Sequence, residues 1–111
     1  MSKKYTVRIA IDPPGDVPPG GSVGNFAYSL SLVNVNANDQ ITWTCDYPFA
    51  VSFKEGTPID QMEVFGSPQG KRFSTHSYKV RAVRGHFHYA VAVWNGSRVF
   101  IDASCPHVRV N

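Results

Sequence analysis

Hydrophobic and polar residues alternate with a period of two along most of the chain. The alternation covers residues 5–11, 26–35, 41–45, 49–53, 78–82 and 87–93, and two shorter runs, 99–101 and 108–110. Successive side chains of a β-strand point to opposite faces, so this alternation is typical of strands with one buried face. Turn residues separate the runs at intervals of about 8–12 positions. The pattern predicts an all-β fold of about seven or eight short strands, arranged as a sandwich or a small barrel.

Three segments depart from the alternation. Residues 12–21 hold four prolines and three glycines and are therefore expected to form a loop. In the irregular stretch 54–72, Pro58 predicts one short helical turn over residues 59–65, with acidic residues near its positive end. The dipeptide Asn95-Gly96 is a strong signal for a tight hairpin turn, because both positions tolerate a positive φ.

Length and composition limit the class of protein. A chain of 111 residues predicts one domain, residues 1–111, and 42% hydrophobic against 17% charged residues favours a packed core over disorder. No apolar stretch reaches the ~18 residues that a membrane span requires. The formal net charge is +3 and the basic residues do not cluster, which argues against a nucleic-acid-binding surface.

The N-terminus and the cysteines bear on the cellular compartment. Residues 1–4 lack the apolar segment of a secretory signal, so we expect a cytoplasmic protein. The alternative is an exported mature domain from which a leader has been removed. Cys45 and Cys105 are expected to be free thiols, because a lone pair of cysteines without a denser framework is typical of a reducing compartment. A disulfide between them would favour export.

Four sequence segments carry a family resemblance. Residues 36–44 form an Asn-Asp turn that leads into a strand with Thr42-Trp43, and Tyr47-Pro48-Phe49 opens the next strand. Tyr78-Lys79-Val80 and residues 85–89 follow later in the chain. Together these segments resemble the cupredoxin family over most of residues 36–110. The resemblance implies a single-domain, mostly antiparallel Greek-key β-sandwich.

The copper ligands of that family are missing from this sequence. The resemblance implies an imidazole ligand after Pro48, where this chain has Phe49, and a thiolate at the position of Val91. The following loop, residues 94–98, contains neither histidine nor methionine. A blue-copper site needs a thiolate and two imidazoles. We therefore expect a copper-free domain without a cofactor.

Aromatic residues give the first candidate binding site. If the resemblance holds, the turn at Pro48 and the turn after Trp94 lie at the same end of the sandwich. Tyr47, Phe49 and Trp94 are then expected to form an apolar surface that binds a protein partner or a second copy of the chain. The alternative is that these aromatics only close the end of the core.

Histidines give the second candidate site. His86 and His88 are two positions apart on one predicted strand, so both imidazoles are expected on its outer face. With a third donor from His76 or His107, they would form a weak site for copper or zinc. The alternative is that these are solvated surface histidines.

Enzymatic motifs are scarce. Cys105-Pro106-His107 places a thiol beside an imidazole, but the proline favours an extended backbone that separates their side chains. The sequence predicts first a non-enzymatic, copper-free cupredoxin-like module that binds a protein partner or a ligand. The alternative is a metal-binding protein that uses its surface histidines, and a small enzyme of unknown class is the third hypothesis.

Overall fold

The structure is a computed structural model that describes residues 2–12, 25–96, 99–102 and 106–111. Its described elements are all β-strands, which confirms the all-β prediction. The strands are β1 (Lys4–Asp12), β2 (Asn25–Tyr28), β3 (Leu32–Val35), β4 (Gln40–Cys45), β5 (Phe49–Phe53), β6 (Glu63–Phe65), β7 (Ser67–Gln69), β8 (Arg72–Ser74), β9 (Tyr78–Lys79), β10 (Gly85–Trp94), β11 (Val99–Asp102) and β12 (His107–Val110). The count exceeds the predicted seven or eight for two reasons. Residues 54–74 form three strands of three residues, and the run 26–35 is divided into β2 and β3. Among the residues just given, no helix is long and apolar enough to cross a membrane.

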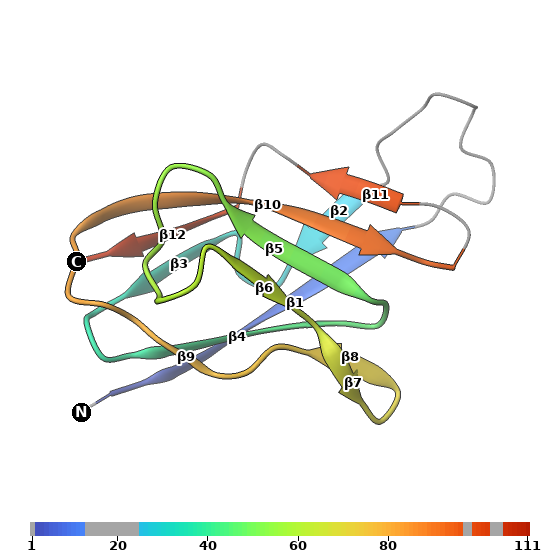
Figure 1. Cartoon of the computed structure of the whole chain (residues 1–111), viewed down its shortest axis with the longest axis horizontal. Helices are drawn as coiled ribbons and strands as arrows, with labels where there is room; N and C mark the ends of the chain where they lie inside the picture. The colour runs from blue at the N-terminus through green and yellow to red at the C-terminus, as the bar shows by residue number, and fades with distance from the viewer. Residues whose placement is uncertain (1, 13–24, 97–98, 103–105) are drawn as a thin grey trace.

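The strands form two mixed sheets that lie one over the other (Figure 1). The first sheet has the order β2-β1-β4-β8-β7, and β9 also pairs with β4. The second sheet has the order β3-β12-β10-β5-β6, and β11 also pairs with β10. Two of the pairings are parallel, β1 with β4 and β3 with β12, and the others are antiparallel. In Figure 1 the second sheet faces the viewer.

The core fills the space between the two sheets. In each sheet one parity of the alternating residues is buried, as in the pattern of β4, where Ile41, Trp43 and Cys45 are buried. Trp43 is fully buried, as the period-two alternation predicts. Its indole makes edge-on contacts across the core with Phe53 (ring centroids 6.1 Å apart) and Tyr89 (5.8 Å), both from the second sheet. These aromatic contacts hold the two sheets face to face.

The prediction of a helical turn over residues 59–65 is wrong. Glu63–Phe65 is strand β6, which pairs antiparallel with β5 and places Val64 in the core between two exposed neighbours. The polar residues before β6 form a turn that is not helical. The Thr57 hydroxyl accepts a hydrogen bond from Ile59 N (3.2 Å) and donates one to Gln61 O (2.6 Å). Pairing with β5 satisfies the backbone of β6 and buries Val64, which a single helical turn on the surface would not do.

A buried carboxylate joins the start of β1 to the turn before β4. Asp39 accepts hydrogen bonds from the backbone N–H groups of Asn36 and Lys3, each at 2.9 Å. These bonds lower the pKa of Asp39, with that from Asn36 contributing most. The preceding residue, Asn38, has a φ of 76°, a left-handed conformation that asparagine tolerates well.

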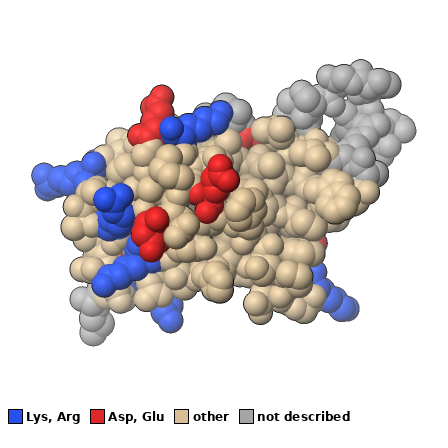
Figure 2. All heavy atoms as spheres, viewed as in Figure 1, with Lys and Arg blue, Asp and Glu red and all other residues tan. Residues whose placement is uncertain are grey.

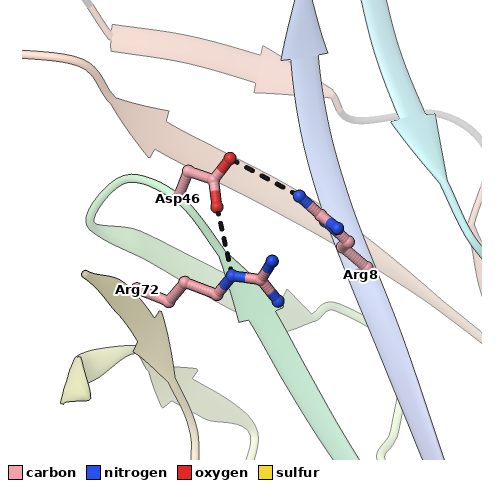
Figure 3. Close-up of polar contacts among 3 residues, drawn as sticks. All are labelled: Arg8, Asp46 and Arg72. Atoms are coloured by element: carbon pink, nitrogen blue, oxygen red, sulfur yellow. Dashed lines mark ion pairs between the residues drawn. The ribbon is translucent and has the colours of Figure 1, made fainter. Parts of the chain in front are cut away.

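A three-residue ion-pair cluster spans the outer face of the first sheet. Asp46, just after β4, lies 3.7 Å from Arg8 of β1 and 3.6 Å from Arg72 of β8 (Figure 3). All three side chains are at least half exposed. Ion pairs in that environment contribute at most about 1 kcal/mol each, so the cluster is a minor source of stability.

Candidate functional site

Strand β10 carries the two chemically distinct surfaces of the second sheet. Its odd-numbered residues face the core, and its even-numbered residues face outward. The outward residues begin with His86 and His88, continue with Ala90 and Ala92, and end with Trp94. The outer face of this one strand therefore changes from imidazole at its start to apolar at its end.

The apolar surface is built from adjacent strands in register. Ala92 pairs with Ile101 of β11 on one side and with Ala50 of β5 on the other, and Ala50 pairs with Phe65 of β6. One row across four strands therefore reads Ile101, Ala92, Ala50, Phe65. In the next row, Trp94 pairs with Val99 of β11. We call these six residues the apolar face.

The large side chains of the apolar face are exposed, and three of them line a shallow groove. The exposed fractions are 62% for Phe65, 52% for Trp94, 60% for Val99 and 55% for Ile101. Between them the small alanines leave a groove of about 290 Å³. The groove is lined by Pro48, Phe49, Ala50, Phe65, Ala92, Val93, Trp94 and Val99. Large apolar side chains are unusual at such exposure when they gather in one place, so this surface is the strongest candidate for binding a partner.

The apolar face ends where polar residues begin. In the row next to Ala92, Ala90 pairs with Ser52, and Ser52 pairs with Glu63 of β6. Figure 2 shows the same side of the molecule, with acidic and basic side chains gathered mostly over its left half. The area around the C-terminal end of β10, at the right, is mostly uncharged.

The structure brings two of the three aromatics of the first candidate site, Phe49 and Trp94, to one groove, but only Trp94 is exposed. Trp94 is exposed on the apolar face, and its backbone N–H donates to Pro48 O at 2.9 Å. Phe49, in contrast, is only 6% exposed, so its expected place on an open surface is wrong. Its ring packs against the backbone of Gly66, where a Cβ would lie 2.3 Å from Phe49 Cε1. Tyr47 is partly buried against the core and does not line the groove.

Of the large members of the apolar face, three were not candidates from the sequence. Phe65 fell within the expected helical turn, where it had no strand partner. Val99 and Ile101 alternate with Phe100 and Asp102, and alternation alone does not say which pair faces inward. The structure buries Phe100 and exposes Val99 and Ile101. The alanines and bulky apolar residues of this face lie on different strands. They could be recognised as one surface only once the register between those strands was known.

The structure brings three of the four histidines together. His86 and His88 are exposed, as expected, and His107 of β12 lies directly opposite His88. The ring centroids are 4.7 Å apart for His88 and His107 and 5.3 Å apart for His86 and His107. His76 belongs to the segment between β8 and β9 in the first sheet, and its ring contacts Tyr78. Of the two expected third donors, His107 is therefore the neighbour of the pair.

No metal centre is preformed in the part of the chain that the structure describes. There, no three histidine, cysteine, aspartate or glutamate side chains are arranged to hold a metal ion as they stand. The His88 and His107 ring planes are stacked at 30°.

Two titratable groups of the core show the effect of burial. Burial raises the pKa of Tyr89 to about 12, against a smaller opposing contribution from the Trp43 indole. Neither Tyr89 OH nor Trp43 Nε1 has a hydrogen-bond partner among the described residues. Burial also raises the pKa of Cys45, a free thiol on β4. A thiol held protonated in this way is a poor nucleophile, and Cys105 lies outside the described residues.

Comparison of the chain with protein-family models and with curated proteins finds no match to either.

Proposed function

We propose that this chain is a non-enzymatic interaction module that associates with a second copy of itself through the apolar face. The observation that carries the proposal is the gathering of four large apolar side chains, each more than half exposed, on neighbouring strands, three of them lining one groove. Contiguous apolar surface on a soluble protein typically marks an interaction site. The six residues come from four different strands, so the surface is a product of the fold rather than of one apolar segment.

We also propose that the sandwich is of cupredoxin type, without copper. The connectivity supports this assignment, because the chain changes sheet between β2 and β3, between β3 and β4, and between β4 and β5. Such alternation between sheets is typical of Greek-key sandwiches. Phe49 and Val91, which occupy the positions of an imidazole and a thiolate ligand in the resemblance, are apolar and buried. Addition of Cu²⁺ should therefore give no intense blue thiolate-to-copper absorption band.

The charge distribution permits a second copy as the partner. The chain carries a formal net charge of +3, so two copies repel each other at long range. The apolar face contains no charged residue, and the nearest row ends with the single carboxylate of Glu63. Two identical apolar faces can therefore meet without like charges in contact.

The shape of the apolar face is complementary to itself. Large side chains at both ends of the row Ile101, Ala92, Ala50, Phe65 flank two alanines. A two-fold axis that runs along the strands over Ala50 sets Phe65 of each copy above Ala92 of the other. The same patch then supplies the protruding side chain and the floor that receives it, which is the requirement for a closed two-fold dimer.

The size of the apolar face predicts weak association. Four strands at a spacing of about 4.8 Å give a row about 14 Å wide. Such a face of six residues falls below the roughly 20–30 residues and ~800 Å² that each partner contributes to a stable complex. We therefore expect a dimer with a dissociation constant on the order of 100 μM.

The test is the oligomeric state as a function of concentration. In sedimentation equilibrium between about 10 μM and 1 mM, the wild-type chain should shift from monomer toward dimer. The double variant Phe65→Ser/Trp94→Ser should remain monomeric, and its thermal midpoint should stay within a few degrees because both side chains are exposed. Leu32→Ser is the matched control, since Leu32 is an exposed apolar residue on the same sheet but outside the apolar face.

A charge pair tests the position of the axis. Ala50→Lys and Ala50→Glu each place like charges opposite one another in the dimer and should each abolish association. Mixing the two variants should restore it, because opposite charges then meet. A wild-type chain that stays monomeric at 1 mM would overturn the proposal. Loss of association in Leu32→Ser alone would assign the contact to another surface.

A further inference from the structure

The start of β10 and the end of β12 bring two arginines to one place on the second sheet. Arg109 of β12 lies directly opposite His86 of β10, and Arg84 precedes Gly85, the first residue of β10. In Figure 1 this part of the sheet lies at the left, near the C-terminus, and Figure 2 shows basic side chains at the same end. The two arginines are far apart in the sequence, so the strand pairing gathers them rather than a basic segment.

The pairing of His86 with Arg109 is of the closer kind found in antiparallel sheets. Tyr89 N–H donates to Pro106 O at 3.1 Å, and hydrogen-bonded pairs alternate with non-hydrogen-bonded pairs along such a ladder. In this register, His86 and Arg109 form a non-hydrogen-bonded pair, whose side chains approach most closely. Both side chains are exposed on the outer face of the sheet. The guanidinium and the imidazole therefore share one small area of that face.

A pocket opens on the surface at this point. It has a volume of about 340 Å³ and is lined by Arg84, Gly85, His86, Arg109, Val110 and Asn111. The lining contains two guanidinium groups and no acidic side chain. The His86 ring contacts the His107 ring at a centroid distance of 5.3 Å, and it lines the pocket without leaving this contact. The polar side chains of the pocket therefore present mainly N–H donors to a ligand.

Both arginines of the pocket lack an ionic partner. Among the residues that the structure describes, the ion pairs are those of Asp46, and neither Arg84 nor Arg109 takes part in one. A guanidinium group stays charged at physiological pH, and its planar N–H donors match two oxygens of a phosphate group. The side chains of the pocket thus provide two positive charges without a carboxylate to balance them.

We propose that Arg84, His86 and Arg109 form a binding site for the phosphate group of a small phosphate monoester. Such a group carries a charge of about −1.5 to −2 at pH 7, which matches the two guanidinium groups. Each guanidinium can donate to two phosphate oxygens, and an N–H of His86 adds a further donor. At ~30 Å³ per water molecule, the pocket holds about ten waters, which leaves room for the organic part of an ester.

The exposure of the site predicts weak binding. All three side chains are exposed, so water and salt screen their charges. We expect a dissociation constant on the order of 1 mM at low salt, and a severalfold weaker one in 0.5 M salt, roughly as screening requires. The site lies at the opposite end of β10 from the apolar face, so it is separate from the proposed dimer contact.

The experiment is a two-dimensional ¹H–¹⁵N NMR titration of the full chain with glycerol 3-phosphate. The backbone amides of Gly85, His86 and Arg109 should shift and saturate, and glycerol alone should cause no shift. Inorganic phosphate tests for a free anion and should bind about threefold or more weakly, because it lacks the organic part. Dimethyl phosphate, a diester with a single negative charge, should bind about tenfold more weakly than glycerol 3-phosphate.

Variants separate a defined site from the effect of net charge. Arg84→Gln and Arg109→Gln should each weaken binding about three- to tenfold, since each removes one charged donor group. Lys79→Gln is the matched control: it also lowers the net charge by one, but Lys79 lies on β9 of the first sheet. Its affinity should change by less than about twofold. Arg109→Lys should recover only part of the affinity, because an ammonium group lacks the planar pair of donors.

Two controls concern the protein itself. Circular dichroism of each variant should match the wild type, because the substituted side chains are exposed. A Gly-Ser extension after Asn111 should not weaken binding, since it moves a terminal carboxylate away from the pocket. Phe65→Ser/Trp94→Ser should bind glycerol 3-phosphate as the wild type does, so the outcome is independent of the proposed dimer.

Three results would overturn the proposal. The first is the absence of saturable shifts at the start of β10 and the end of β12. The second is an equal loss of affinity in Lys79→Gln and Arg109→Gln, which would indicate attraction by net charge alone. The third is inorganic phosphate binding as tightly as glycerol 3-phosphate, which would assign the pocket to a free anion rather than an ester.

Discussion

Phe49 and Trp94 lie on opposite sides of the same sheet, although both line the same groove. Phe49 pairs with Val93 in register, and Trp94 is the next residue of β10, so the two aromatics are neighbours in the pairing. Val93 and its partner Phe49 face the core, and one step further along β10 the side chain of Trp94 faces solvent. The exposed fraction is 6% for Phe49 and 52% for Trp94. The inner side of the second sheet therefore supplies stability, and its outer side supplies the surface that is available for binding.

The difference teaches that a cluster of aromatics in a sequence does not define a surface. The strand parity decides which aromatic is exposed, and the neighbouring strands decide what surrounds it. Trp94 lies in an apolar setting because β11 contributes Val99 and Ile101, whereas the other end of the same outer face is occupied by histidines.

The largest expected effect is the difference in stability between variants of Phe49 and of Trp94. Phe49→Ala should lower the free energy of unfolding by about 3–5 kcal/mol, because it removes a buried ring and leaves a cavity. Trp94→Ala should change it by no more than about 0.5 kcal/mol, since an exposed side chain contributes little to folding. Urea denaturation of both variants measures the two values. Equal effects would contradict the assignment of the two residues to different sides.

The second effect tests whether water reaches the core-facing side of β10. Tyr89 keeps its proton in the folded state up to a pKa of about 12, whereas an unfolded tyrosine ionises near 10. Because ionisation favours the unfolded chain, this contribution is fully present below pH 10 and is lost as pH rises to 12. The loss should approach about 3 kcal/mol. Tyr89→Phe should remove this part of the alkaline loss of stability, as measured by denaturation at several pH values.

Tyr89→Phe at neutral pH provides the control for that measurement. The hydroxyl has no hydrogen-bond partner among the described residues, so its removal should change the stability by less than about 1 kcal/mol. The two proteins differ only in this hydroxyl, so the difference between the two curves isolates Tyr89. An unchanged alkaline slope in the variant would mean that Tyr89 is hydrated.

A smaller effect tests the close packing of Phe49. Gly66→Ala would place a Cβ 2.3 Å from Phe49 Cε1 and 2.6 Å from Cδ1, so the buried ring would have to move. We expect a loss of about 1–3 kcal/mol in the free energy of unfolding. A double-mutant cycle with Phe49→Leu should show that the two changes are not additive, because the smaller side chain makes room for the methyl group. Additive effects would contradict the contact.

The smallest expected effect concerns the first sheet. Asp46→Ala removes both ion pairs with Arg8 and Arg72, yet all three side chains are exposed to solvent. The stability should fall by less than about 1 kcal/mol, and by less still in 1 M salt, where surface charges are screened. A salt-independent loss as large as that of Gly66→Ala would show that Asp46 has a structural role beyond these pairs.

Much of the fold was predictable from the period of the hydrophobic pattern. Two-residue alternation identified the long strands and the burial of Trp43, because one buried face of a sheet imposes that period. Residues 59–65 were mispredicted for the opposite reason. Pro58 and the nearby acids are local signals, whereas β6 exists through its pairing with β5, and pairing between separate segments leaves no local trace.

The candidate sites were predictable in part. Parity placed His86 and His88 outside, but the contact with His107 depends on the register between β10 and β12. Of the three aromatics expected at the surface, Trp94 is the exposed one. Phe49 was misplaced because its role came from a ligand position in the resemblance. Once the ligand is replaced by an apolar ring, burial is the stable outcome.

The unequal burial of the two tryptophans gives the protein two separate optical reporters. Trp43 is enclosed by the rings of Phe53 and Tyr89, and Trp94 is half exposed at the edge of the groove. An indole in an apolar core emits at shorter wavelengths than one in water and is shielded from soluble quenchers. The emission of this chain should therefore divide into a shielded component that follows unfolding and an accessible one that follows occupation of the groove. Replacing either tryptophan by phenylalanine would leave one emitting tryptophan. Its fluorescence would then report either unfolding or occupation of the groove, without an attached label.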